Sequence, residues 1–158
     1  MPVKLSTTLS KLLAIPNGIN AKLLEELHLF MKKNDCSESH RNNTLKTSIA
    51  FANFLGPEQS FHEIRTKDKI TAFLDTKIKN AQDDPDRRWI TTWNDYLGDL
   101  KYLFRWLHNY KIKEEQGLEP CPNSSEWITP DFALIKKRKN KRLSLRRITY
   151  VFVMATNI

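Results

Sequence analysis

The side chains best suited to chemistry in this sequence form a run of cations at residues 136–147, KKRKNKRLSLRR. The run holds eight of the chain's 26 lysine and arginine residues and none of its 18 aspartates and glutamates. Residues 1–135 therefore carry 18 charges of each sign, and the run alone accounts for the net charge of +8. Lysine and arginine neutralise phosphates and release their counterions, so the run predicts a polyanion as partner, a nucleic acid first of all. A membrane surface is less favoured because no apolar helical face adjoins the run.

Two patterns look like parts of a catalytic site, but neither is predicted to be one. Residues 62–65 spell HEIR, a His-x-x-Arg pair, and Tyr150 is a possible nucleophile. A tyrosine attacks a phosphate only where arginine and lysine groups surround that phosphate. The sequence leaves no room for such an arrangement around either pattern. His62 is interpreted as a polar residue in a connection and Tyr150 as a packing or exposed residue, and the chain is not expected to be an enzyme.

The histidines and cysteines are not spaced as metal ligands, and no Gly-rich phosphate loop is present, so no metal or cofactor is predicted. The start of the chain does not resemble a signal peptide, and no apolar run approaches the roughly 20 residues that span a bilayer. The expected compartment is the cytoplasm, where Cys36 and Cys121 stay free thiols, and a disulfide between them is the alternative. The dispersed histidines are His28, His40, His62 and His108.

Apolar residues at helical spacing predict four helices that must position these groups. After the turn Pro16-Asn17-Gly18, Asn20 is expected to cap the first helix, and Thr66 to cap the third. The second helix is expected over about residues 39–55, where Gly56-Pro57 stops it because glycine suits a left-handed cap and proline cannot continue a helix. The core-facing residues predicted for these three helices are Leu23, Leu27, Phe30, Met31, Leu45, Ile49, Ala52, Ile70, Phe73, Leu74 and Ile78.

The fourth helix, over residues 90–109, has the strongest pattern. Its apolar residues step by three and four positions over about five turns, which predicts a continuous buried seam and a central place in the fold. The seam residues are Ile90, Trp93, Leu97, Leu100, Phe104 and Leu107, with Trp89, Tyr96 and Trp106 beside them.

The fold class predicted from these elements is all-α, a small four-helix bundle followed by a basic linker. Residues 1–19 are interpreted as a lead-in and residues 20–110 as the helical domain. A loop and the basic linker follow over residues 111–147. Residues 148–158 form a short tail, which begins with strand-like β-branched residues.

The order of these segments resembles a known module. WNDYLGDLKYLFRWLHN (93–109) is similar to the last long helix of the core-binding domain of tyrosine recombinases, the phage-integrase family, and WITPDFALIKKRKNKRLS (127–144) is similar to the linker that follows it. Asn43-Thr44 with IAFANFLG (49–56) resembles the family's first long helix, and KDKITAFLD (67–75) resembles its next. The combination looks most like archaeal members.

The resemblance covers roughly residues 37–144 and implies both a fold and a partner. In that family the core-binding domain is a small helical (SAM-like) bundle that forms half of a clamp around duplex DNA during integration and recombination. The basic linker crosses the DNA to a separate catalytic domain. Here the chain ends at residue 158, so we expect DNA binding without the catalytic half, and a truncated or frameshifted gene is one hypothesis for the tail.

The predicted DNA contacts lie on the basic linker and on two helices. Three of them fall near the start of the second helix, and two are one turn apart on the fourth, where polar and cationic side chains suit phosphates and base edges. Ordinary solvated helix faces are the alternative for each helical residue. The full set is Lys136, Lys137, Arg138, Lys139, Lys141, Arg142, Arg41, Asn43, Lys46, Lys101 and Arg105.

Three alternatives stay open at the level of sequence. The chain could be a helical protein-interaction or regulatory module, such as a decoy or partner of a full-length recombinase, with the seam of the fourth helix serving a partner. The basic run could be a solvated tail, or an import signal, which short basic runs imitate. The favoured interpretation is a cytoplasmic, nucleoid-associated protein that binds duplex DNA alone, with itself, or with a full-length recombinase.

Replacement of Lys136, Lys137, Arg138 and Lys139 by alanine is expected to weaken binding to duplex DNA. The slope of log affinity against log salt should become flatter by about 0.9 for every phosphate that is no longer neutralised. Fluorescence anisotropy over a salt series measures both quantities. An affinity and a slope equal to those of the unchanged chain would contradict the role given to the run.

Overall fold

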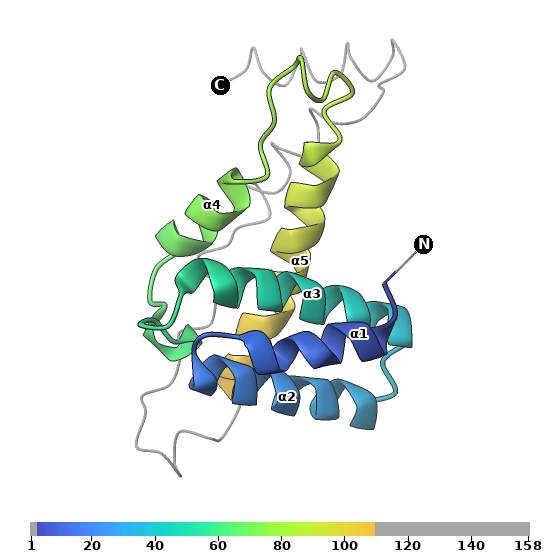
Figure 1. Ribbon diagram of the computed structural model, residues 1–158, viewed down its shortest axis with the longest axis vertical. Helices are drawn as coiled ribbons and strands as arrows, with labels where there is room; N and C mark the ends of the chain where they lie inside the picture. The colour runs from blue at the N-terminus through green and yellow to red at the C-terminus, as the bar shows by residue number, and fades with distance from the viewer. Residues whose placement is uncertain (1–2, 110–158) are drawn as a thin grey trace, which may run out of the picture.

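The computed structural model describes residues 3–109, which form an all-α fold (Figure 1). The basic run, the loop before it and the tail after it lie outside the described residues. Within residues 3–109 there is no strand, and no helix has the length and apolar character needed to cross a membrane. The elements are α1 (Leu5–Ser10), η1 (Lys11–Ala14), α2 (Gly18–Lys33), α3 (Glu38–Leu55), η2 (Phe61–Glu63), α4 (Asp68–Asp75) and α5 (Trp89–Asn109), where η denotes a 3₁₀ turn.

Helix α3 lies between the two halves of the fold. It packs against α1 and α2 on one side and against α5 on the other, while α4 packs on α5. Figure 1 shows the axes of α1, α2 and α3 roughly aligned, with α2 antiparallel to the other two. Helix α5 crosses behind them at a steep angle, and α4 lies beside its upper part. The crossing of α3 and α5 therefore joins the parts of the bundle.

The seam predicted for the last helix is confirmed. The six seam residues named above, the first Ile90 and the last Leu107, are all buried, and none is more than 1% exposed. The one polar group among them is satisfied, since the Trp93 indole Nε1 donates to Asp75 of α4 at 3.2 Å. The start of α5 is held by Asp84, whose carboxylate accepts from the Trp89 backbone N–H at 2.8 Å. The helix is thus fixed by a buried face and a capped first turn.

Aromatic rings join the elements around this seam. The ring of Phe51 on α3 is fully buried, and its centroid lies 5.2 Å from that of Phe73, 5.9 Å from that of Phe61 and 6.1 Å from that of Phe104. These partners belong to α4, η2 and α5, so one side chain contacts three elements that follow α3 in sequence. Aromatic pairs at such distances stabilise a core beyond their buried area.

Two predicted helix caps are wrong by a few residues. The cap of α2 is Asn17, whose Oδ1 accepts from the N–H groups of Ile19 and Asn20 at 3.0 and 3.1 Å. Asn20 is buried instead, where its Oδ1 accepts from the Phe61 N–H at 2.8 Å and its amide donates to the Gln59 carbonyl at 3.1 Å. Both asparagines suit a cap, and the earlier one follows the proline that ends the preceding segment.

The second predicted cap, Thr66, does not cap α4. Its hydroxyl donates to the Asp68 carboxylate at 3.1 Å, and the N-cap position is Lys67. Because α4 ends at Asp75, Ile78 lies beyond it and is 43% exposed rather than buried as predicted. Phe30 of α2 is also 42% exposed, although its ring lies 6.3 Å from that of Trp106.

The predicted limits of α3 agree with the structure to within a residue. Ser37 caps the helix by accepting from the His40 N–H at 3.2 Å, and Gly56 follows its last residue with a φ of 75°. A positive φ is the conformation for which glycine was expected at this stop.

Residues 1–19 contribute more than the lead-in expected from the sequence. Leu5, Leu12 and Ile15 are part of the buried core, and the buried Thr8 of α1 donates to the Asn42 side chain of α3 at 2.6 Å. A six-residue helix of leucine, serine and threonine is too short to give a periodic pattern, so the sequence did not indicate it.

Phe51→Ala is expected to lower the free energy of unfolding by about 3–5 kcal/mol, because it leaves a cavity among Phe61, Phe73 and Phe104. Urea denaturation followed by circular dichroism measures the change. Phe54→Ala is the matched control: this ring lies on the same helix but is 42% exposed, and its loss should be about 1 kcal/mol or less. Equal losses for the two variants would contradict the central place of Phe51.

Candidate nucleic-acid interface

A buried polar junction connects α3 and α5 where they cross. The half-buried Asp99 carboxylate of α5 accepts from the hydroxyls of Thr47 at 2.7 Å and Thr44 at 3.3 Å, both on α3. The two threonines are buried, and Thr44 also accepts at its carbonyl from Ser48 at 2.7 Å. These hydrogen bonds satisfy the Asp99 carboxylate and both threonine hydroxyls. Because they join particular residues of α3 and α5, they fix the register of one helix on the other.

An open groove lies over this junction, with a volume of about 790 Å³. Its walls come from α3 and α5 alone, from the turns of each helix that flank the crossing. Three cations line it, Lys46 from α3 and Lys101 and Arg105 from α5, and His40 lies at the α3 wall. The groove also holds two carboxylates, Asp95 and Asp99, so it is a concave surface with a small excess of positive charge. Its shape depends on the crossing of the two helices.

The groove brings together four of the five helical residues predicted as DNA contacts. Asn43 and Lys46 lie on one wall, and Lys101 and Arg105 on the other. Residues three or four apart share a helix face, so each pair points to the same side of its helix. Whether the two pairs face each other depends on the crossing of α3 and α5, which the sequence does not show.

Arg41, the fifth predicted helical contact, does not line the groove. Its Nε atom is buried without a hydrogen-bond partner among residues 3–109. The pKa of His28 on α2 is lowered, first by burial of its imidazole and second by the positive charge of Arg41. Arg41 thus lies toward α2, because residues two apart on a helix, such as Arg41 and Asn43, do not share a face. The predicted contacts of the basic run lie outside the described residues.

The groove places like charges close together. The pKa of Lys101 is lowered from its usual value, first by burial and then by the positive charge of Arg105. An anion beside the amine would oppose both causes, since an opposite charge favours the protonated form. A phosphate in the groove would therefore relieve the repulsion between these two side chains.

The pKa of the Asp99 carboxyl is raised, and burial is the main cause. Hydrogen bonds from Thr47 and Thr44 and the charge of His40 oppose the shift, while the nearby Asp95 adds to it. The groove thus contains two carboxylates, the half-buried Asp99 and the exposed Asp95. The sequence analysis missed both, although their spacing of four residues on the predicted last helix indicated a shared face.

Tyr102 and His40 close one end of the groove. Their rings meet edge to face at 5.2 Å, and the Tyr102 hydroxyl lies 3.8 Å from the Cys36 sulfur. Burial, with the Cys36 contact second, raises the pKa of Tyr102 to about 12. The phenol therefore stays neutral at pH 7 and is a poor nucleophile. Cys36 is a free thiol in the described part of the chain.

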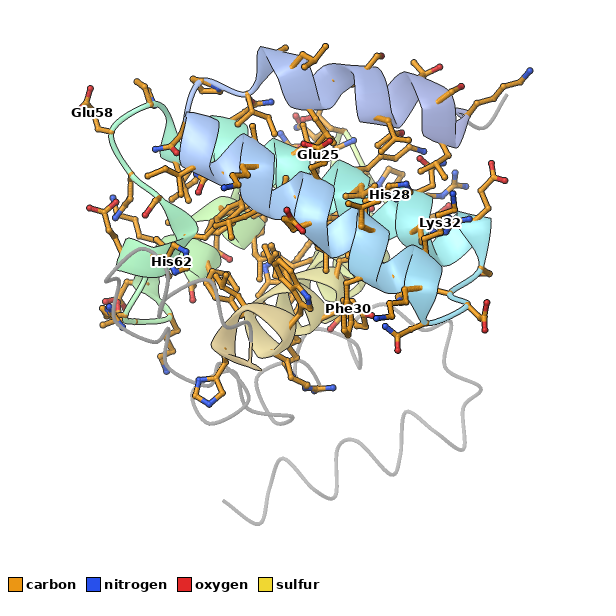
Figure 2. The ribbon with its side chains drawn as sticks, turned by 90° about the horizontal axis from the view of Figure 1, so that it is seen from below. Glu25, His28, Phe30, Lys32, Glu58 and His62 are labelled. Atoms are coloured by element: carbon orange, nitrogen blue, oxygen red, sulfur yellow. The ribbon has the colours of Figure 1, made fainter. Side chains whose placement is uncertain are left out.

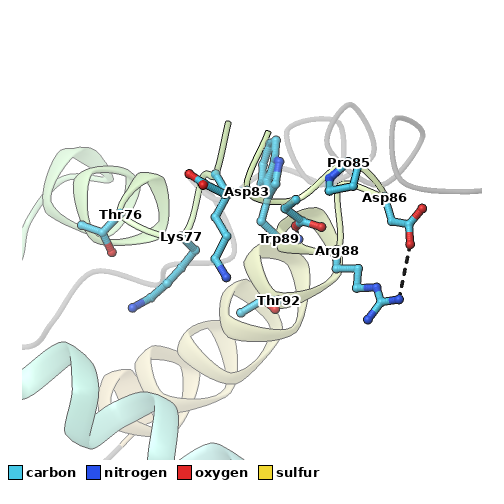
Figure 3. Close-up of a pocket in the computed structure, with 10 residues that line it drawn as sticks. Thr76, Lys77, Asp83, Pro85, Asp86, Arg88, Trp89 and Thr92 are labelled. Carbon is cyan, nitrogen blue, oxygen red and sulfur yellow. Dashed lines mark hydrogen bonds and ion pairs between the residues drawn. The ribbon is translucent and has the colours of Figure 1, made fainter. Parts of the chain in front are cut away.

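A second hollow of about 610 Å³ lies at the start of α5 (Figure 3). Its cations are matched by carboxylates, and Arg88 pairs with Asp86 at 3.3 Å. Lys77 lies over the rings of Phe73 and Tyr96, at 4.9 and 5.4 Å from their centroids, so its charge is already used in a cation–π contact. This hollow is a weaker candidate for an anion. Its charged residues are Lys77, Lys79, Arg88, Asp83, Asp84 and Asp86.

The HEIR segment falls at η2, where His62 is 3% exposed and does not line the α3–α5 groove. Figure 2 shows His28 on α2 and His62 on the segment before α4, two different elements. In the part of the chain that the structure describes, no three His, Cys, Asp or Glu side chains are grouped to hold a metal ion. Tyr150 lies outside that part.

Comparison of this chain with protein-family models, with curated proteins and with solved structures finds no match. The resemblance to recombinase core-binding domains therefore stays a prediction from the sequence. The groove itself is the basis for a functional proposal.

Asp99→Asn is expected to flatten the dependence of stability on pH. Because the folded carboxyl has a raised pKa, the folded chain keeps this proton to a higher pH than the unfolded chain does. The contribution of Asp99 to stability is thus greatest below its unfolded pKa and is lost as pH rises through the folded pKa. The asparagine variant cannot ionise, so its free energy of unfolding relative to wild type should rise from about pH 4 to about pH 7.

Urea denaturation at several pH values tests this expectation. The other titratable and charged groups of the groove, His40, Lys46, Asp95, Lys101 and Arg105, are present in both proteins, so their contributions largely cancel. Asp83→Asn, which removes an exposed carboxylate outside the groove, serves as the control and should follow wild type. Parallel pH profiles for Asp99→Asn and wild type would contradict the burial of this charge.

Proposed function

We propose that this chain binds duplex DNA, with the α3–α5 groove contacting the duplex and the basic run 136–147 adding phosphate contacts. One observation carries the proposal: Asn43 and Lys46 of α3 share a groove with Lys101 and Arg105 of α5. The sequence indicates each of these residues by its chemistry alone, independently of how the fold arranges them. Their convergence supports a common ligand.

The charges of the groove suit a polyanion. Lys101 and Arg105 are one turn apart, with Cβ atoms about 5–6 Å from each other, so both side chains can contact neighbouring phosphates of one strand. Lys46 reaches the same groove from the other helix. Cations from two crossing helices can thus contact the backbone at several points, which positions a protein on DNA.

The proposed role is that of a core-binding module in DNA integration or recombination, as the sequence resemblance implies. It is a binding role, and strand cleavage is not part of it. Tyr102, which lines the groove, has its pKa raised to about 12, first by burial, so its phenol is neutral at pH 7.

The alternative of a helical protein-interaction module relied on the apolar seam of α5. That seam is used within the fold, where Trp93, Leu100 and Phe104 are fully buried. A partner helix would have to bind elsewhere on the surface. The groove is the surface that the predicted contact residues favour, so duplex DNA is preferred over a partner helix.

Combined replacement of Lys46, Lys101 and Arg105 by alanine is expected to weaken duplex binding strongly. The slope of log affinity against log salt should fall by about 0.9 for each phosphate that these side chains neutralise, up to about 2.7 for the three. Anisotropy titrations with a labelled duplex, repeated over a salt series, measure the affinity and the slope.

The matched control replaces Lys22, Lys33 and Lys69 by alanine, three exposed lysines on α2 and α4 that do not line the groove. It removes the same net charge and should leave most of the affinity and slope intact. Equal effects of the two triple variants would show diffuse charge attraction, and a wild-type chain that binds no duplex would exclude the proposed function.

A further inference from the structure

An exposed carboxylate lies within the cationic groove. Asp95 of α5 lines it together with Lys46, Lys101 and Arg105, and its side chain has no hydrogen bond or ion pair with any of residues 3–109. Beside a phosphate backbone, such a charge repels the ligand. Its presence in a groove for DNA therefore needs a reason other than affinity for phosphates.

No structural role accounts for Asp95. A carboxylate interacts favourably with the helix dipole in the first turn of a helix, but Asp95 lies beyond the first turn of α5. It stands four residues before Asp99, so the two like charges repel each other on one face, and Asp95 adds to the raised pKa of the Asp99 carboxyl. Unlike Asp99, it makes no bond to α3. Its charge lies among the cations of the groove, but no hydrogen bond or ion pair fixes its side chain within residues 3–109.

Base edges are the part of a duplex that a carboxylate can bind favourably. In the major groove, cytosine N4 and adenine N6 carry exposed amino groups, which donate hydrogen bonds to aspartate or glutamate and to asparagine. Phosphate oxygens carry no such donor. A carboxylate among cations therefore gains a hydrogen bond where it meets an amino group of a base. It weakens binding to any sequence that places a different group at that position.

Asn43 supplies a second group of this kind on the opposite wall. Its amide is exposed, lines the groove, and has no hydrogen-bond partner among the described residues. An amide can donate to N7 and accept from N6 of one adenine. Lys46 lies one turn further along the same face of α3, in position to hold the backbone beside such a base.

We propose that Asp95 and Asn43 read base edges in the major groove, so that the α3–α5 groove selects duplex sequences with cytosine or adenine at the contacted positions. This inference rests on the proposed duplex-binding function and adds sequence selectivity to it. The basic run contributes contacts that are indifferent to sequence, whereas the two helices supply the selectivity.

Selection from a duplex library with a randomised central segment tests the proposal. The full chain should enrich cytosine or adenine at defined positions, by about fivefold or more over the other bases. Asp95→Ala should lose the preference at one position and keep or increase its affinity for random duplex, because a repelling charge is gone. Asn43→Ala should lose the preference at a different position.

Asp95→Asn provides a second variant with a distinct expected result. An amide keeps the acceptor and gains a donor, so the preferred base at the Asp95 position should shift toward adenine. Asp83→Ala, which removes an exposed carboxylate outside the groove, should retain the wild-type preferences. Circular dichroism of each variant checks that the helices are intact.

The outcomes separate base selectivity from duplex binding itself. A wild-type chain that binds duplex without enriching any base, or an Asp95→Ala variant with unchanged preferences, would overturn the inference and leave duplex binding standing. A wild-type chain that binds no duplex at all would overturn both.

Discussion

The contact between α3 and α5 is the constraint on which the other features of this fold depend. On its apolar side, Phe51 packs against Phe104, and the rings of Phe61 and Phe73 also contact Phe51. On its polar side, Asp99 accepts from Thr47 and Thr44. The helices α1 and α2 pack on the far side of α3, and α4 packs on α5. Both the core and the groove are therefore consequences of one helix crossing.

The same crossing explains how a small all-α chain can hold like charges together. Lys101 and Arg105 repel each other on α5, and Lys46 faces them from α3. The apolar seam from Ile90 to Leu107 is buried and fixes the position of α5 in the core. An anionic ligand beside Lys101 and Arg105 would oppose their mutual repulsion. Of the two carboxylates on this surface, Asp99 is half-buried and bonded to α3, and Asp95 is exposed.

Local patterns predicted much of the helical framework, because helical periodicity depends only on neighbouring residues. The seam of α5 and the stop of α3 at Gly56 are examples. The patterns failed where two nearby residues could both serve as the helix cap, and where a helix is too short to show periodicity. Asn17 and Asn20 both suit a cap, and only the position of Phe61 explains why Asn20 is buried. Helix α1 has six residues and left no periodic signal.

By itself, the sequence determined the helical class, the buried face of the last helix and the separation of charge between residues 1–135 and the basic run. It also indicated which polar residues could contact DNA, since residue type and helix face are local properties. Only the tertiary structure decided that Asn43 and Lys46 line one groove with Lys101 and Arg105, while Arg41 lies toward α2. The physical reason is that the rotation and crossing of two helices are set by packing of side chains distant in sequence, which no local pattern records.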